Sequence, residues 1–182
     1  MKQIIVVISG IFLIASLSYA STPEELSQSY FDFMKENQWD KVVEFYDPST
    51  LRNMREKLSF FSEVPNEVAP QILAQFFGPG TTKEMLKIMS DTDFFSSFFK
   101  GVIAQAEQLG GIQFEKVDIL GTVLEGKNLR HVLTRTHTKL GDTTMETIEV
   151  VSFKKMEGGW KMLMQGKIEG MAQQLKKMLS RS

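Results

Sequence analysis

Two histidines and one arginine are the side chains best placed for acid–base chemistry. His131, Arg135 and His137 have the same parity on a predicted strand, so they project from one face. If that face lines a pocket, an imidazole could act as a general base and the guanidinium could hold an anion. If it faces water, as one face of an antiparallel sheet commonly does, the same residues form an ordinary polar surface. A structure with both histidines on the outer face would exclude the enzymatic alternative.

The sequence predicts neither a metal site nor a cofactor. The two histidines are six positions apart, which places them about 20 Å from each other on a strand, too far to share an ion. The chain has no cysteine, which excludes disulfides, thiol catalysis and thiolate-bound zinc. The acidic and phenolic groups of the N-terminal half, Asp32, Asp40, Tyr46 and Asp47, match no catalytic motif. We interpret Asp32 as solvated and Asp40 and Asp47 as helix-end residues, and Tyr46 belongs to the apolar pattern of the short helix near Trp39.

An unusual group of phenylalanines and methionines lies between residues 76 and 99. Its members are Phe76, Phe77, Met85, Met89, Phe94, Phe95, Phe98 and Phe99. Phenylalanine at helical spacing is common in protein cores, so a core role is one interpretation. The other is an adaptable apolar surface for an acyl or ring ligand, or for a protein partner. The sequence leaves both alternatives open.

The first twenty residues have the order of a secretory signal peptide. Lys2 is followed by an apolar run from Ile4 to Leu17, and Ser18-Tyr19-Ala20 places small residues at the two positions that a signal peptidase reads. The run is shorter than the roughly 20 apolar residues that span a bilayer. We therefore expect cleavage near Ala20 and an exported protein, either periplasmic or secreted.

Loss of this segment shortens the chain from 182 to 162 residues, a usual size for one domain. It also removes Lys2, so the balance of basic to acidic residues changes from 21 against 22 to 20 against 22. This charge gives no reason to expect nucleic acid as a partner. We expect a single domain over residues 21–182.

Apolar periodicity divides that domain into a helical half and a strand half. Helices are predicted from Thr22, near Trp39, from Ser49, from Asn66, over 82–89 and from Asp91 to Gly110-Gly111. Period-two patterns predict strands at 112–125, 129–140, 144–156 and 160–165, with a bulge between Phe114 and Val117. Short turns between them favour an antiparallel meander. Residues 167–182 predict an amphipathic tail helix that docks on the domain or lies on an anionic membrane.

Two segments resemble the nuclear-transport-factor-2-like (NTF2-like) superfamily. They are KVVEFYD at 41–47, which follows the first helix, and the closing hairpin VSFKKMEGGWKM at 151–162. The resemblance covers residues 22–50 and 112–166. It implies an α+β fold in which N-terminal helices pack on a curved four-stranded antiparallel sheet, often around a conical pocket. Residues 58–110 depart from the pattern as a helical insert, and the tail helix is also extra.

We therefore expect an exported binding protein for an apolar small molecule, a lipid or a protein partner, with no catalysis. The alternative is a small pocket enzyme, of the isomerase or hydratase type, that uses His131 or His137. Fold alone does not choose between them, because the superfamily includes enzymes, lipid carriers and modules without catalytic activity.

Overall fold

The computed structural model describes residues 21–108, 111–164 and 166–179, so the predicted signal peptide lies outside the described residues. Seven α-helices and four strands occur there in the order α1–α6, β1–β4, α7, with one short 3-10 helix, η1. The predicted fold class is confirmed: N-terminal helices pack on a four-stranded antiparallel sheet, and a helix follows it. No helix of the described part is long and apolar enough to cross a membrane.

The first helix, α1 (Pro23–Lys35), begins at a complete capping box. The Thr22 hydroxyl accepts a hydrogen bond from the Glu25 amide, and the Glu25 carboxylate accepts one from the Thr22 amide. Tyr30, Phe31 and Met34 form the buried side of the helix. A short turn then leads to α2 (Trp39–Glu44).

The cap of the next helix differs from the prediction. Asp47, not Ser49, caps α3 (Pro48–Lys57), because its carboxylate reaches the Ser49 amide at 2.7 Å. The helix ends at Lys57, and the short 3-10 helix η1 (Ser59–Ser62) follows it. Just before α3, Tyr46 forms a parallel bridge with Met162, so the helical half is tied directly to the last strand.

The insert contains three helices, α4 (Ala69–Phe77), α5 (Lys83–Ile88) and α6 (Asp91–Gln108). Thr82 caps α5 as its position suggests, whereas α4 begins three residues after Asn66, without a side-chain cap. Arg55 of α3 holds the insert in place. Its guanidinium donates to the Leu86 and Lys87 carbonyls at the end of α5 and to the Asp91 carboxylate, at 2.7, 3.1 and 3.1 Å.

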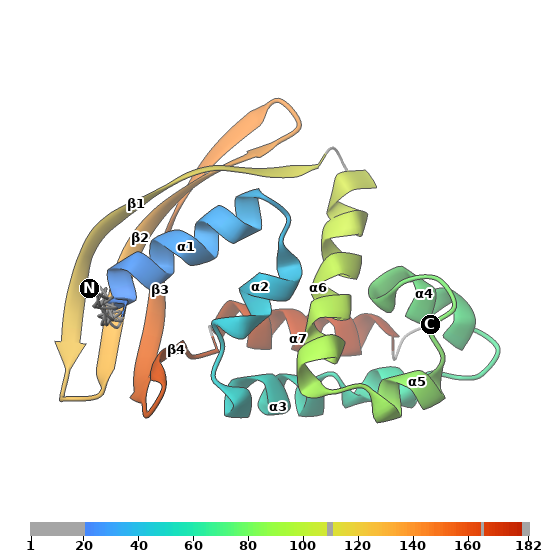
Figure 1. Cartoon of the computed structure of the whole chain (residues 1–182). Helices are drawn as coiled ribbons and strands as arrows, with labels where there is room; N and C mark the ends of the chain where they lie inside the picture. Colours follow the sequence, from blue (N-terminus) through green and yellow to red (C-terminus); the bar gives the residue numbers. More distant parts are fainter. Residues whose placement is uncertain (1–20, 109–110, 165, 180–182) are drawn as a thin grey trace, which may run out of the picture.

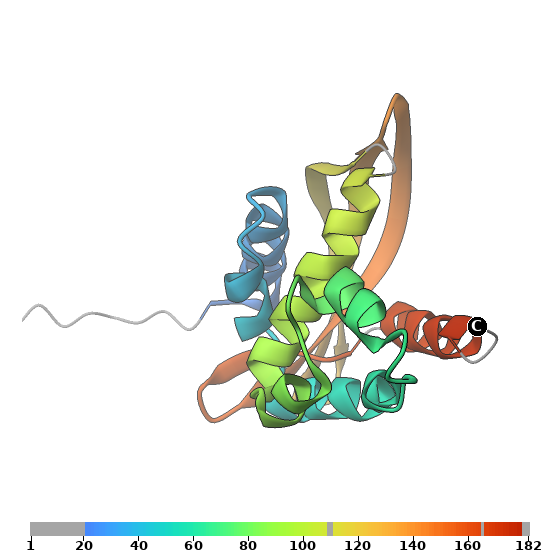
Figure 2. The same ribbon diagram turned by 90° about the vertical axis from the view of Figure 1, so that its right-hand side faces the viewer.

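The sheet is a meander of β1 (Ile112–Glu125), β2 (Leu129–Leu140), β3 (Thr143–Met156) and β4 (Gly159–Met162). The bulge predicted between Phe114 and Val117 is confirmed by a register shift between Phe114 and Lys116, and a second shift lies between Ile119 and Gly121. The strands β1 and β2 arch over α1 (Figure 1), and the β2–β3 hairpin extends beyond the helices (Figure 2).

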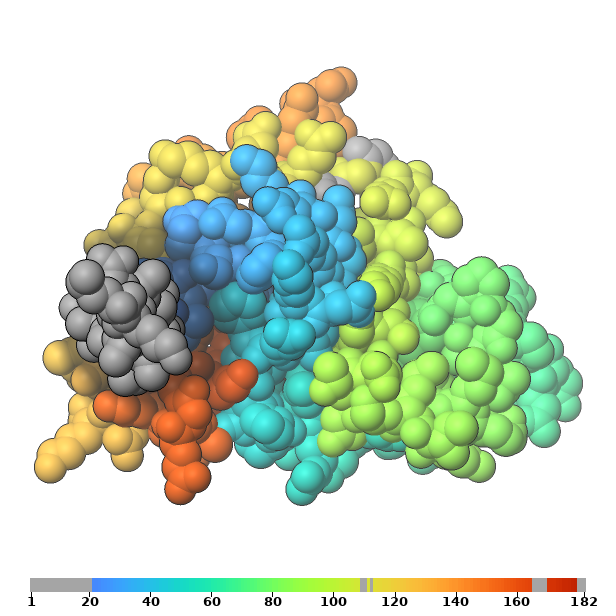
Figure 3. Space-filling view, viewed as in Figure 1, coloured from blue at the N-terminus to red at the C-terminus, as the bar shows by residue number. Residues whose placement is uncertain are grey.

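The inner face of the sheet is covered by helices. Val132, Val151 and Phe153 are fully buried there, while α6 packs on α2, α3 and α4 to extend the same core. In the space-filling view, α1 and α2 lie against the sheet and the insert forms the opposite end of the molecule (Figure 3). The last helix, α7 (Gly166–Leu179), contacts α3, with Ala172 and Leu175 buried. This contact favours docking on the domain for the tail helix.

Candidate functional site

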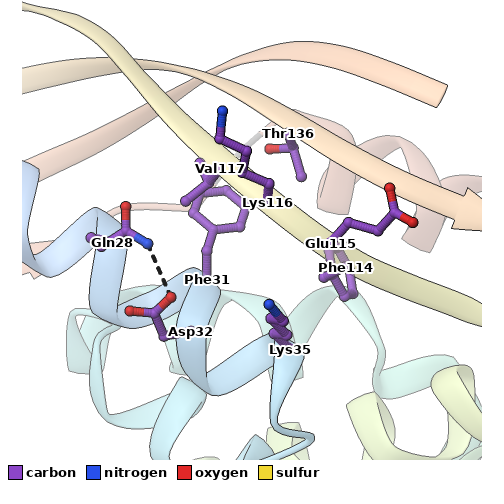
Figure 4. A pocket seen from close by; sticks show the side chains of 9 residues that line it. All are labelled: Gln28, Phe31, Asp32, Lys35, Phe114, Glu115, Lys116, Val117 and Thr136. Atoms are coloured by element: carbon purple, nitrogen blue, oxygen red, sulfur yellow. Dashed lines mark hydrogen bonds between the residues drawn. The ribbon is translucent and has the colours of Figure 1, made fainter. Parts of the chain in front are cut away.

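A groove runs between α1 and the first two strands, on the inner face of the sheet (Figure 4). Its narrower part has a volume of about 170 Å³, and a wider hollow of about 430 Å³ adjoins it through the shared residues Lys35, Phe114 and Glu115. The two parts are lined by Gln28, Phe31, Asp32, Met34, Lys35, Asn37, Gln113, Phe114, Glu115, Lys116, Val117 and Thr136.

The groove exists because α1 and β1 separate at a defined point. The helical repeat turns Phe31 and Met34 toward the sheet, while Asp32 and Lys35 stay at the opening. Opposite them, the register shift after Phe114 places Glu115 outside the regular pairing of the two strands. One side of α1 and the irregular part of β1 therefore face each other without complete packing, and this leaves the groove.

The lining combines an apolar floor with a charged rim. Phe31, Phe114 and Val117 supply the floor, and all three contribute to the core or pack against it. The rim carries charges of both signs, and Gln28 donates a hydrogen bond to the Asp32 carboxylate at 3.0 Å (Figure 4). A cavity of about 150 Å³ can hold a benzene-sized molecule. The dimensions therefore suit a small ligand that has an apolar body and a polar end.

The groove also contains a polar atom without a partner. The Thr136 side chain lines it, Thr136 is only 4 % exposed, and within the described part of the chain its hydroxyl makes no hydrogen bond. A buried hydroxyl without a partner costs about 1–3 kcal/mol. Such an atom in a hollow is available to a ligand or a water molecule.

The phenylalanines singled out in the sequence are mainly core residues. Phe76, Phe77, Phe94, Phe95 and Phe98 are buried. The rings of Phe76, Phe77, Phe94 and Phe98 pack on one another or on Phe61, whereas Phe95 packs on Tyr46 and Phe99. Phe99 is partly buried between Trp39 and Phe95. None of them lines the groove, or the separate hollow of about 340 Å³ beside Leu73 in the insert. Two helices with aromatic faces bury those faces against each other, which sequence spacing alone could not decide.

The two methionines of that group have different environments. Met89 is half-buried against the core and its carbonyl oxygen accepts a hydrogen bond from Arg55. Met85 is exposed on α5. Neither lines the groove.

His131, Arg135 and His137 lie on the outer face of the sheet, away from the groove. The alternating burial of β2 shows this, because Val132, Thr134 and Thr136 are the residues that point toward the helices. The pocket-enzyme hypothesis required at least one of these histidines on the inner face. Its two candidate bases are therefore outside the pocket, and their polar environment is a cross-strand network.

That network pairs both imidazoles with carboxylates. His131 lies 2.8 Å from the Ser152 hydroxyl and 2.7 Å from Glu125, and His137 lies 3.0 Å from Asp118. The ammonium of Lys116, together with hydrogen bonding from His137, lowers the pKa of Asp118. These contacts explain the residue types at these positions without a bound substrate.

The other acidic and phenolic residues have structural partners. Asp40 accepts a hydrogen bond from Lys100 at 2.8 Å and another from Ser96, and these contacts lower its pKa. Asp47 caps α3, and Tyr46 is buried in contact with Tyr30. Of the four acidic and phenolic residues considered in the sequence, only Asp32 lines the groove.

Most residues of the groove carried no signal in the sequence. Phe31 is one apolar residue on an apolar helix side, and Thr136 has the parity opposite to the histidines. The bulge after Phe114 was the one feature that could have indicated the position, since bulges often lie beside sites. Among the described residues, no three of His, Cys, Asp and Glu come together as a metal site.

No family model matches the chain. No curated protein matches it either. Among solved structures, the chain is similar to an NTF2-like protein from Campylobacter jejuni, provisionally described as a transpeptidase, with 15 % identity and a TM-score of 0.41. The match covers 80 % of this chain and 100 % of the other. That structure is described as NTF2-like, and this is the superfamily that the segments at 41–47 and 151–162 resemble. At this level of similarity the match gives no argument about activity.

Proposed function

We propose that this chain is an exported binding protein without catalytic activity, and that it takes a small, mainly apolar ligand in the groove between α1 and β1. The buried hydroxyl of Thr136 is the observation that carries the proposal, since it is a polar group without a partner that lines the groove together with the apolar floor. Ligand sites of this kind are apolar with a few placed polar groups.

The ligand would lay its apolar part on Phe31, Phe114 and Val117 and hydrogen-bond to Thr136. Its polar end would reach the rim, where Lys35 can meet an anionic group. Catalysis has less support, because the two histidines lie on the other face of the sheet.

Thr136→Val tests the proposal, because it separates binding from folding. Valine has nearly the same shape and removes the hydroxyl, so the free protein should become more stable, by about 1–3 kcal/mol. Binding should weaken at the same time, because the ligand loses its hydrogen bond. The probe is the fluorescent anion 1-anilinonaphthalene-8-sulfonate, which has an apolar ring system and one charge. Titration with this probe measures the binding affinity, and urea denaturation measures the free energy of unfolding.

Thr134→Val is the matched control. Thr134 is two residues away on the same face and equally buried, but its hydroxyl donates to the Glu149 carbonyl at 3.4 Å and does not line the groove. This variant should lose about 1 kcal/mol of stability and bind the probe normally. A second variant, Val117→Trp, should fill the groove and prevent binding. Equal probe affinity in all three variants would exclude the groove as the site.

A further inference from the structure

One end of the sheet carries two turns that lie side by side. The first, at 126–128, joins β1 to β2, and the second, at 157–158, joins β3 to β4. The Asn128 carbonyl oxygen of the first turn accepts a hydrogen bond from the Lys155 amide beside the second, at 2.8 Å. Both turns lie at the end of the sheet that points away from the insert (Figure 1). We call residues 123–130 and 154–161 the hairpin end.

The hairpin end is basic, although the whole chain has a formal charge of −1. It contains five basic and two acidic residues. Lys127, Lys154 and Lys155 are exposed, whereas Lys161 donates a hydrogen bond to the Glu44 carbonyl oxygen at 2.7 Å. Strand pairing gathers these charges from two separate hairpins, so the basic surface is a property of the fold.

Three of the nearby carboxylates are engaged within the protein. Glu125 is paired across the strands with an imidazole at 2.7 Å, and Glu24 accepts a hydrogen bond from the Thr122 hydroxyl. Asp47 is buried and caps α3. Glu157 is exposed in the second turn. The lysines therefore dominate the charge that the hairpin end presents to its surroundings.

Apolar side chains are exposed among these charges. Leu124 is 66 % exposed, Val123 64 % and Met156 40 %. Leu124 is two residues before the first turn, which places it about 7 Å from the tip by the rise of a strand. Segments that lie in a membrane interface bury apolar side chains about 5–10 Å deep. Leu124 is thus within reach of the acyl boundary when the turns meet a bilayer.

Trp160 adds an aromatic ring with cations over it. The Arg130 guanidinium lies 5.1 Å from the ring centroid, and the Lys155 ammonium lies 5.9 Å from it. Tryptophan is enriched at the membrane–water interface, where the ring lies at headgroup level. Lysine and arginine lay their apolar stems along such a surface and keep the charge in the headgroup layer.

The position of α1 indicates a membrane as the occupant. The helix begins beside the hairpin end, because Glu24 in its first turn contacts Thr122 of β1. The predicted signal peptide, with its apolar run at 4–17, directly precedes this helix. While that run is in the membrane, the chain holds the hairpin end toward the bilayer. A nucleic acid would match the lysines but would leave Leu124 in water.

We propose that the hairpin end docks, turns first, on a membrane surface that carries anionic phospholipids. The exposed lysines meet the phosphates, Trp160 lies at headgroup level, and Leu124 enters the acyl boundary. The contact is reversible and needs no spanning segment. It is independent of ligand binding, because no residue of the hairpin end lines the groove.

Sedimentation of the purified exported protein with vesicles tests the charges. The protein should bind phosphatidylcholine vesicles that contain about one third phosphatidylglycerol, and not vesicles of phosphatidylcholine alone. Added salt should weaken the binding by screening. The double variant Lys154→Ala, Lys155→Ala should lower the partition coefficient about 25-fold, about five-fold for each lysine. The control Lys87→Ala, Lys139→Ala removes the same charge from α5 and from the opposite end of β2, and should bind normally.

Two further variants test the orientation. Leu124→Ser should lower the partition coefficient about five-fold or more, whereas Ile88→Ser, at a residue 86 % exposed on α5, should leave it unchanged. Nitroxide-labelled lipids should quench the fluorescence of Trp160. Trp160→Phe leaves Trp39, which is buried in the core, so its remaining fluorescence should be insensitive to these lipids.

Three outcomes would overturn the proposal. The first is failure of the protein to bind the anionic vesicles. The second is binding that the lysine and Leu124 variants leave unchanged. The third is binding that is lost in Lys176→Ala, Lys177→Ala, which would assign the membrane contact to α7. Circular dichroism of each variant shows whether its fold is intact.

Discussion

At the scale of single residues, the buried pair Tyr30 and Tyr46 shows what burial does to ordinary side chains. Their hydroxyl oxygens lie 3.1 Å apart, and neither ring is more than 5 % exposed. Burial raises the pKa of Tyr30 to about 12 and also raises the pKa of Tyr46 well above its ordinary value, with the Tyr30 hydroxyl adding to the second effect. Deprotonation of either phenol would place a charge inside the core.

This pair predicts loss of stability at alkaline pH. Both folded pKa values lie above the unfolded value of about 10, so the folded state holds the protons more tightly. That contribution is complete below about pH 10 and is lost as the pH rises toward 12.

The measurement is the ultraviolet absorbance of phenolate, followed together with circular dichroism. The chain has three tyrosines, and Tyr19 lies in the predicted signal peptide, so the exported protein would contain only the buried pair. Phenolate should therefore form only as the protein unfolds. Titration of a tyrosine near pH 10 in a folded protein would contradict the prediction.

At the scale of elements, the crossing of α4 and α6 depends on one glycine. Gly101 lies in the middle of α6, where glycine is otherwise unfavourable. A Cβ atom added there would lie 2.0 Å from the backbone carbonyl oxygen of Phe76. The glycine thus lets the backbones of α4 and α6 come close together, and their aromatic side chains then pack into one core.

We expect Gly101→Ala to destabilise the protein. Alanine would favour the helix by about 1 kcal/mol. The overlap with a backbone atom cannot be relieved by a side-chain rotation, and overpacking of this kind costs about 1–3 kcal/mol or more. The net effect on the free energy of unfolding, measured with urea, should be a loss.

Gly170→Ala is the matched control in α7. Gly170 is also inside a helix, but it is exposed, and nothing lies within 4 Å of an added Cβ atom. This variant should gain about 0.5–1 kcal/mol from helix propensity alone. If both alanine variants were stabilising, the close crossing of α4 and α6 would be wrong.

At the scale of the whole molecule, the two faces of the sheet differ in what covers them. Helices cover the inner face and leave a groove beside α1, while the outer face stays exposed, including the apolar residues Ile148 and Val150. Export would leave this arrangement intact. Cleavage after Ala20 keeps Thr22, whose side chain caps α1.

We expect the exported protein to begin at Ser21. Its intact mass after recovery from outside the cytoplasm would show this directly. A variant with Ala20→Arg should accumulate the uncleaved form, because the peptidase requires a small residue at the cut site. Recovery of a chain that retains residues 1–20 in the membrane fraction would contradict the prediction.

The sequence by itself determined the elements and the class of fold. Periodicity and turn residues located the four strands to within a few residues, as in 129–140, and the slip in parity after Phe114 indicated the bulge. These features are local, because the side-chain period of a strand and the φ of a turn glycine depend on near neighbours. The sequence did not determine which residue caps a helix. Both Asp47 and Ser49 have side chains that can cap α3, and the conformation of the backbone before the helix decides between them.

Only the tertiary structure decided which faces are buried and where a site lies. The strand 129–140 has no clearly apolar face, so nothing in it showed whether His131 or Thr136 would point toward the helices. Likewise, the spacing of Phe94 and Phe98 is the same in a core and in an open apolar surface, and it was the approach of α4 at Gly101 that closed the cluster. Burial depends on contacts between segments far apart in the sequence, and a local pattern does not contain them.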